Sequence, residues 1–330
     1  MRIVKTFKKI VYRLFPRFVL HKIKTVYKLL EQTAFEFADD KAVKMSAALS
    51  FYMIFSLTPL IVILIAVIGF IFGEDAAKGE IVMQIQDAIG KDNAEIVQSL
   101  IQNISAPSSG IIATIISSAI IIFGSAGIFV ELKESLNMIW GVEPKPDGIW
   151  SFLRARAKSF VMVLIIMLLL FASIMLSTIL SGVNNFLEGN LNTVIPGWQY
   201  VNYFLSYVLV TVLIAIIYKF LPDVKVQWKY IWFGAIITSL LFALGKYLIG
   251  LYLASSSYGS VFGAAGSLVV FMAWIYYSSF IFFFGAEFTQ VYRNKYAKAP
   301  LLTNNYAVKI GKITDLINDA MEKKKEESPG

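Results

Sequence analysis

Hydrophobic residues in this chain are gathered into long stretches that alternate with short polar segments. Each stretch is about 20 residues or longer, the length at which an α-helix crosses a ~30 Å hydrocarbon core. The apolar stretches are Ser46–Phe72, Gly110–Val130, Ser159–Gly182, Tyr203–Leu221, Ile231–Leu253 and Ser267–Phe288. The pattern predicts an all-α polytopic membrane protein, a bundle of six transmembrane helices within residues 45–292.

Two regions outside these stretches carry apolar residues at helical spacing, which predicts amphipathic extramembrane helices. The first is a basic arm, residues 1–44, which Pro16 divides into two helices. We favour its binding to the anionic inner leaflet over a solvated arm. Its second helix is expected to pack through Ile23, Val26, Tyr27, Leu30 and Phe37. The second region is the outer loop 76–104, whose two short helices, separated by Gly90, either pack on the bundle or form a lid.

Positive charge predicts the orientation in the membrane. Of 30 lysines and arginines, all but Lys78, Lys91 and Lys246 lie on the two terminal segments and on alternate loops. Because basic residues are retained on the cytoplasmic side, both termini and the tail 293–330 are expected in the cytoplasm. The net charge of +8 and a hydrophobic fraction of 57% fit a membrane protein, and fold signals for nucleic-acid binding are lacking. No cysteine is present, so disulfides and thiolate metal sites are excluded.

Helix-breaking residues inside the stretches admit two interpretations. Pro59 lies in the middle of the first stretch, where it removes a backbone hydrogen bond and is expected to kink the helix. Glycines mark the second and fifth stretches, at Gly124, Gly127, Gly234, Gly245 and Gly250. Small residues at such positions usually allow close contact between helices. The alternative is broken helices that line a cavity.

A few ionisable residues at membrane depth carry most of the functional information. Lys246 lies in the fifth stretch, where an unpaired lysine costs roughly 2.5 to 3.5 kcal/mol. We expect it either to extend to the outer interface or to face the bundle interior as an anchor for an anionic group. Glu134 and Asn137 share a helix face at the inner end of the second stretch, and Lys133 lies on another. Glu287 lies near the inner end of the sixth stretch, so Glu134 and Glu287 are expected near a cytoplasmic mouth.

An enzymatic function is not indicated. The single histidine, His21, lies in the basic arm without ligand partners, and no set of His, Asp and Glu has the spacing of a metal site. The sequence has no glycine-rich phosphate loop and no serine accompanied by a base. We therefore expect no catalytic residues, no metal and no cofactor.

Several motifs follow one another along the chain. The first runs from Ala47 to Leu60, the second from Leu132 to Trp140, and the third begins at Leu221-Pro222-Asp223 and continues to Gly285-Ala286-Glu287. Together they resemble the YihY/BrkB family of bacterial inner-membrane proteins. The resemblance covers about residues 42–292 and implies six spans in the plasma membrane. Family members were once labelled ribonuclease BN, an assignment since regarded as mistaken, and are often described as transporters. The motif positions add Ser50, Tyr252 and Tyr258 to Glu134, Asn137, Lys246 and Glu287 as candidate pathway residues.

These observations lead to one preferred function and two alternatives. The preferred one is transport of an amphipathic or anionic solute, with lipids among the candidates. The first alternative is a structural or regulatory envelope protein that does not transport, and a membrane-bound hydrolase is disfavoured. Membrane lipids are the expected partners, nucleic acid is not, and a homo-oligomer is compatible with the sequence.

Overall fold

The structure, a computed structural model, describes five continuous ranges of the chain. They are residues 17–73, 127–144, 198–255, 264–304 and 307–309, with scattered residues between 75 and 99 and between 153 and 172. The expected second and third spans therefore lie largely outside the described residues, as do the segment 1–16 and most of the tail.

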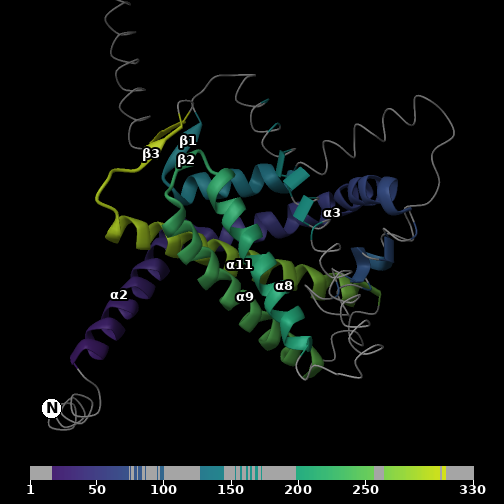
Figure 1. The fold of residues 1–330 in the computed structure, drawn as a ribbon, viewed down its shortest axis with the longest axis horizontal. Coiled ribbons are helices and arrows are strands. Elements are labelled where there is room, and N and C mark those ends of the chain that lie inside the picture. The colour runs from purple at the N-terminus through teal and green to yellow at the C-terminus, as the bar shows by residue number, and fades with distance from the viewer. Residues whose placement is uncertain are drawn as a thin grey trace, which may run out of the picture.

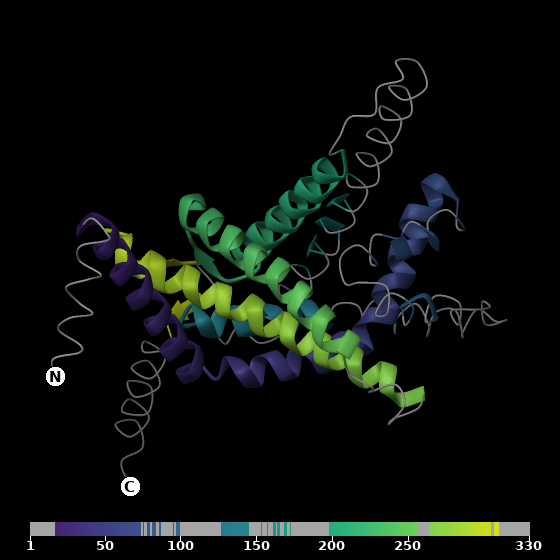
Figure 2. The same ribbon diagram turned by 90° about the horizontal axis from the view of Figure 1, so that it is seen from below.

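Long helices make up most of the described chain (Figures 1 and 2). They are α2 (Arg17–Asp39), α3 (Ala42–Phe72), a helix over residues 127–139, α8 (Trp198–Phe220), α9 (Trp228–Ser255) and α11 (Ala264–Tyr296). Three of them contain segments long and apolar enough to cross a membrane: Ala42–Ala66, Trp228–Leu248 and Phe271–Tyr296. A shorter apolar segment, Phe204–Phe220, lies in α8.

Helix α11 is the central element of the bundle. It packs against α9, α3 and α2, and Figure 1 shows it running through the middle of the described helices. The apolar window of α11 is 56% buried, compared with 33% for those of α3 and α9. Side chains on α11 are therefore enclosed by protein more fully than those on α3 and α9.

The contact between α9 and α11 depends on a reciprocal glycine–threonine arrangement. Thr289 of α11 lies against Gly234 of α9, and Thr238 of α9 lies against Gly285 of α11. Each threonine hydroxyl donates to the carbonyl of the glycine four residues before it, at 2.8 Å for Thr238 and 2.7 Å for Thr289. The two antiparallel backbones thus approach closely, as expected for small residues between membrane helices. Gly245 repeats the pattern against Tyr277 and Ile281.

The arm helix α2 docks on α11 through a narrow stripe. Leu29, Thr33 and Phe37, spaced four residues apart, are buried, and the ring of Phe37 lies 4.6 Å from that of Phe280. Val26, Tyr27 and Leu30, which we expected to pack, are exposed. The packed stripe is thus rotated from the expected one, because the aromatic surface of α11 selects Phe37 and its helical neighbours.

Helix α3 follows α2 after a sharp corner. Lys41 at the corner has a φ of 57°, which turns the chain before α3 begins at Ala42. Figure 2 shows the two halves of α3 running in different directions, and Pro59 lies in the middle of this helix. A proline inside a helix removes one backbone hydrogen bond and so accounts for such a bend.

Two short antiparallel strand pairs tie the helix ends together, which departs from a purely all-α fold. Strand β1 (Val142–Pro144) pairs with β4 (Ala307–Lys309), and β2 (Val224–Lys225) pairs with β3 (Leu302–Thr303). The pairs join the segments after helix 127–139 and after α8 to the chain beyond α11 (Figure 1). We call this the strand end of the bundle. It is the end that the charge pattern predicts to be cytoplasmic.

Candidate functional site: a buried ion-pair network at the strand end

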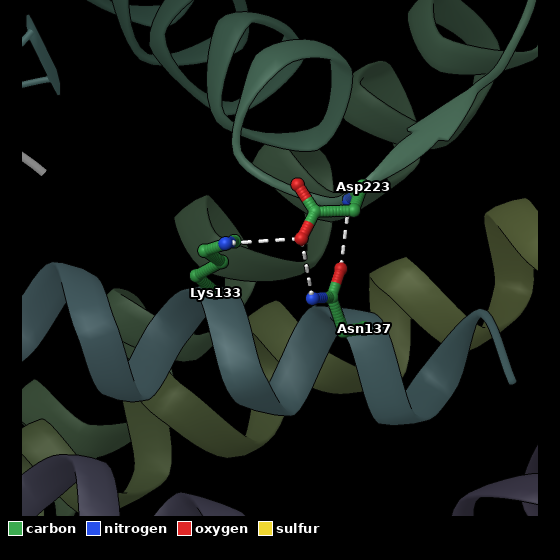
Figure 3. A network of polar contacts seen from close by, with 3 residues as sticks. All are labelled: Lys133, Asn137 and Asp223. Atoms are coloured by element: carbon green, nitrogen blue, oxygen red, sulfur yellow. Dashed lines mark hydrogen bonds and ion pairs between the residues drawn. The ribbon is translucent and has the colours of Figure 1, made fainter. Parts of the chain in front are cut away.

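Three polar side chains from distant parts of the chain meet at the strand end. Lys133 and Asn137 lie four residues apart on helix 127–139 and so point the same way. Asp223 follows α8, which ends at Phe220 because Pro222 disfavours helical geometry in the residue before it. Figure 3 shows both side chains of the helix reaching the carboxylate of Asp223.

Asp223 makes three polar contacts within the network. Lys133 Nζ lies 2.9 Å from Asp223 Oδ2, and Asn137 Nδ2 donates to the same oxygen at 3.1 Å (Figure 3). The backbone N–H of Asp223 donates to Asn137 Oδ1 at 2.7 Å. Asn137 therefore binds Asp223 as a two-point clamp, and Lys133 supplies the opposite charge.

Burial makes this network strongly interdependent. The Lys133 side chain is 6% exposed and that of Asp223 is 0% exposed. Removing one partner of such a pair leaves an uncompensated charge away from water and typically costs 3–5 kcal/mol, roughly. The backbone carbonyl of Asp223 also accepts from the N–H of Asn304, at 3.0 Å, so the chain beyond α11 is fastened to the same residue. The network thus links three helix ends.

A second polar centre lies where α11 meets the corner between α2 and α3. Glu287 of α11 is 0% exposed, and within the part of the chain that the structure describes neither of its carboxyl oxygens has a hydrogen bond of ordinary geometry. The charged groups that act on it are Asp40 at the corner and Glu36 of α2. Burial raises the pKa of Asp40, and the charges of Glu36 and Asp39 raise it further. Within the described ranges, no cation is among the groups that act on either carboxyl.

The structure places the other expected pathway residues separately. Ser50 is buried, with its hydroxyl donating to the Ala47 carbonyl of its own helix at 2.8 Å. Glu134 is exposed on helix 127–139. Tyr252 lies in α9, but its side chain is outside the described part, and Tyr258 lies outside the described residues altogether.

Lys246 differs from the expectation that it faces the bundle interior. Its side chain is exposed on α9, while its neighbour Gly245 packs against α11. One residue along a helix is a rotation of about 100°, so a glycine in the interface turns the next side chain away from it.

The two charged members of the network were not foreseen. We expected Lys133 on a different face from Asn137, which is wrong: the two residues lie four positions apart, so both side chains reach Asp223 from the same face. Asp223 was noted only as part of a motif. An acid directly after the proline that ends an apolar stretch, together with a lysine at the inner end of another stretch, is the signal that could have found the pair. Among the described residues, no group of three or more His, Cys, Asp and Glu could hold a metal ion.

Comparison with known proteins covers nearly all of this arrangement. The family described as "Virulence factor BrkB" matches residues 33–307, which include the network, Glu287, strands β1 to β3 and the first residue of β4. The chain belongs to the BrkB family. This confirms the resemblance in the sequence motifs.

The relatives are named as membrane proteins. A "UPF0761 membrane protein" of Verminephrobacter eiseniae is 26% identical over 258 residues, covering 74% of this chain and 57% of that protein. One of Saccharophagus degradans is 25% identical over 292 residues, covering 86% and 61%. A third, "UPF0761 membrane protein MS0032" of Mannheimia succiniciproducens, is 22% identical over 260 residues, covering 77% and 86%. The chain thus spans a little over half the length of the first two, and no solved structure matches this BrkB family chain.

Proposed function

We propose that this protein is a multi-pass transporter of the bacterial plasma membrane that moves an amphipathic or anionic solute, with lipids among the candidate substrates. In this proposal six helices cross the membrane, and the strand end and both termini are cytoplasmic. The observation that carries it is the Lys133–Asp223–Asn137 network. The ion pair is buried at helix ends, where removing two charges from water is costly, and this supports a role as a contact that closes and opens a gate.

The network has the properties of a contact that holds a gate closed, and we call it the latch. It joins the end of helix 127–139 to the connection between α8 and α9, and both charges are shielded from water. Such a pair has two favourable arrangements: closed, with the charges paired, or open, with water around both. Separation of these two helix ends would therefore open the strand end, and their return would close it.

Other polar residues take complementary roles in this proposal. Glu287, buried beside the corner at Asp40, is assigned to a proton-linked step, and the exposed Glu134 to the mouth. Lys246, which is exposed on α9 rather than turned into the bundle, is assigned to the capture of an anionic group at the helix surface, nearer the end of α9 opposite the strand end. Lys246→Met should then weaken binding of an anionic solute, and Lys246→Arg should keep part of it. Full activity of Lys246→Met would remove Lys246 from the pathway.

The test is flux in vesicles that contain the full-length chain. The probes are fluorescent phosphatidylglycerol, followed by dithionite quenching of the outer leaflet, and the soluble anion carboxyfluorescein. The double variant Lys133→Met/Asp223→Asn removes both charges together and retains an amide at position 223 that can bind Asn137. It should reduce protein-dependent movement of the transported probe at least tenfold.

Glu143→Gln, which changes an exposed acid of β1 at the same end, is the matched control and should move the probe at the wild-type rate. Movement of neither probe by the wild-type protein, or equal movement by the double variant, would overturn the transport proposal for these solutes.

One observation favours the alternative, a structural or regulatory envelope protein. Helix α2 exposes Val26, Tyr27 and Phe35 on the sides that do not touch α11, with Phe35 71% exposed. Such a surface suits contact with the membrane or another protein. An envelope defect in cells that express a Phe35→Ser variant with normal flux would favour this function over transport.

A further inference from the structure

A basic pocket lies at the strand end, beside the network but separate from it. Its volume is about 830 Å³, and it opens between the end of α8, the start of α9 and the chain that follows α11. Five cationic side chains line it, and none of its lining residues is acidic. They are Lys219, Lys225, Lys229, Arg293 and Lys298.

Two of these cations are held in place by backbone carbonyls. Lys219 Nζ donates to the carbonyl of Val226 at 2.5 Å and lies over the ring of Trp228, and Arg293 donates to the carbonyl of Ala299 at 2.7 Å. A lysine has three N–H donors and an arginine five, so each retains donors for a ligand. The lysines at 225, 229 and 298 are exposed and surround the opening.

The beginning of α9 adds to the positive field. Gln227, Trp228, Lys229 and Tyr230 line the pocket, and α9 is 28 residues long. The N-terminus of a long helix carries a partial positive charge that favours anions, phosphate groups above all. The cationic side chains, their N–H donors and the N-terminus of α9 therefore all favour a phosphate group as the ligand.

The residues around the pocket favour a phosphate group that belongs to a lipid. Trp228 of the pocket packs beside the exposed Phe220 and Trp232, with ring centroids 5.9 and 6.3 Å apart. Tryptophans of this kind gather at the boundary between hydrocarbon and headgroups. Along α9 the exposed residues continue as Phe233, Ile236 and Leu240, within the candidate span Trp228–Leu248. An acyl chain would find an apolar path directly beside the basic pocket.

We propose that this pocket binds the phosphate headgroup of an anionic phospholipid from the leaflet at the strand end. Lys225, Lys229 and Lys298 contact the phosphate from the rim, Arg293 and Lys219 contact it from the wall, and the acyl chains lie along α9. Binding of this lipid does not require transport, so a test of this site does not depend on the function proposed above.

The test is native mass spectrometry of the full-length protein released from detergent with added lipids. The wild-type protein should bind dioleoyl phosphatidylglycerol at least tenfold more tightly than dioleoyl phosphatidylcholine. The variant Lys225→Gln/Lys229→Gln/Lys298→Gln should lose this preference, with affinity for phosphatidylglycerol falling by about a hundredfold, or about fivefold for each rim cation. The rim lysines are exposed, so folding should be unaffected.

The matched control removes the same charge elsewhere. Lys78→Gln/Lys91→Gln/Lys295→Gln changes three lysines that are neither among the lining residues of the pocket nor in the basic arm, and it should retain the wild-type preference. An equal loss in this control would show general electrostatic attraction and overturn the site. Full displacement of the lipid by millimolar inorganic phosphate or glycerol 3-phosphate would identify a soluble phosphate site and overturn the assignment to a lipid.

Discussion

Thr289 of α11 occupies the space in which a side chain on Gly234 of α9 would have to lie. The mirror contact, Thr238 against Gly285, lies one helical turn away, so the two helices lock together at two levels. Neither threonine can turn aside without breaking its bond to a helix carbonyl. The close approach of α9 and α11 therefore depends on the absence of two β-carbons.

Gly234→Ala should accordingly destabilise the protein. The new methyl group overlaps Thr289, and overpacking of this kind costs about 1–3 kcal/mol, whereas alanine would otherwise favour the helix. The measurement is thermal unfolding of the purified protein in detergent. Gly79→Ala, at a glycine with open space around it, is the control and should be neutral or slightly stabilising. Equal stability of the two variants would contradict this packing.

The buried network predicts a marked non-additivity. Lys133→Met leaves Asp223 without its cation, and Asp223→Asn leaves the buried ammonium of Lys133 without its anion, so each should destabilise by about 3–5 kcal/mol. The double variant contains neither charge and retains an amide pair between positions 137 and 223. Its destabilisation should be smaller than that of either single variant. Denaturant unfolding measures the cycle, and additive losses would mean that the two charges do not interact.

The long helices could be predicted from the sequence because the length and hydrophobicity that define them are local properties of the chain. The stretch Ile231–Leu253 lies within α9, Trp228–Ser255, and Ser267–Phe288 lies within α11, Ala264–Tyr296, since length and hydrophobicity define a membrane helix. The helix ends extend beyond the apolar stretches because a helix does not stop where the hydrocarbon does. The glycines were correctly interpreted as contact points at Gly234 and Gly245.

The site was harder to predict than the helices because its residues are distant from one another in the sequence. Asn137 and Asp223 are separated by 86 positions, and no periodicity relates them. Strands of two or three residues, such as β2, are likewise too short for an alternating pattern. Their pairing depends on the helices that bring them together. The same holds for Lys246, whose exposure is decided by which face of α9 meets α11.

Asp40 predicts a pH dependence of stability. Burial holds the pKa of this carboxyl above its ordinary value of 3.8, so the folded state binds the proton more tightly than the unfolded state. Stability should therefore fall as pH rises from that ordinary value through the raised one. Asp40→Asn lacks this loss, so it should unfold at a higher temperature than wild type at pH 7, and the difference should vanish toward pH 4. Glu31→Gln, at an exposed acid of α2 that is not among the groups acting on Asp40, is the control. A difference that grows toward low pH would contradict the assignment.

Orientation in the membrane can be tested directly because the chain contains no cysteine. Single cysteines at Asn103, Asn185 and Ser256, on the loops expected outside, should react with a membrane-impermeant maleimide in intact cells. Cysteines at Lys145 and Lys225 should react only after permeabilisation. Lys225 is informative because it is exposed in β2 at the strand end, so failure to react in intact cells cannot come from burial within the protein. Labelling at Lys225 without permeabilisation would invert the proposed topology. It would also place the Lys133–Asp223 latch and the basic pocket on the outer side.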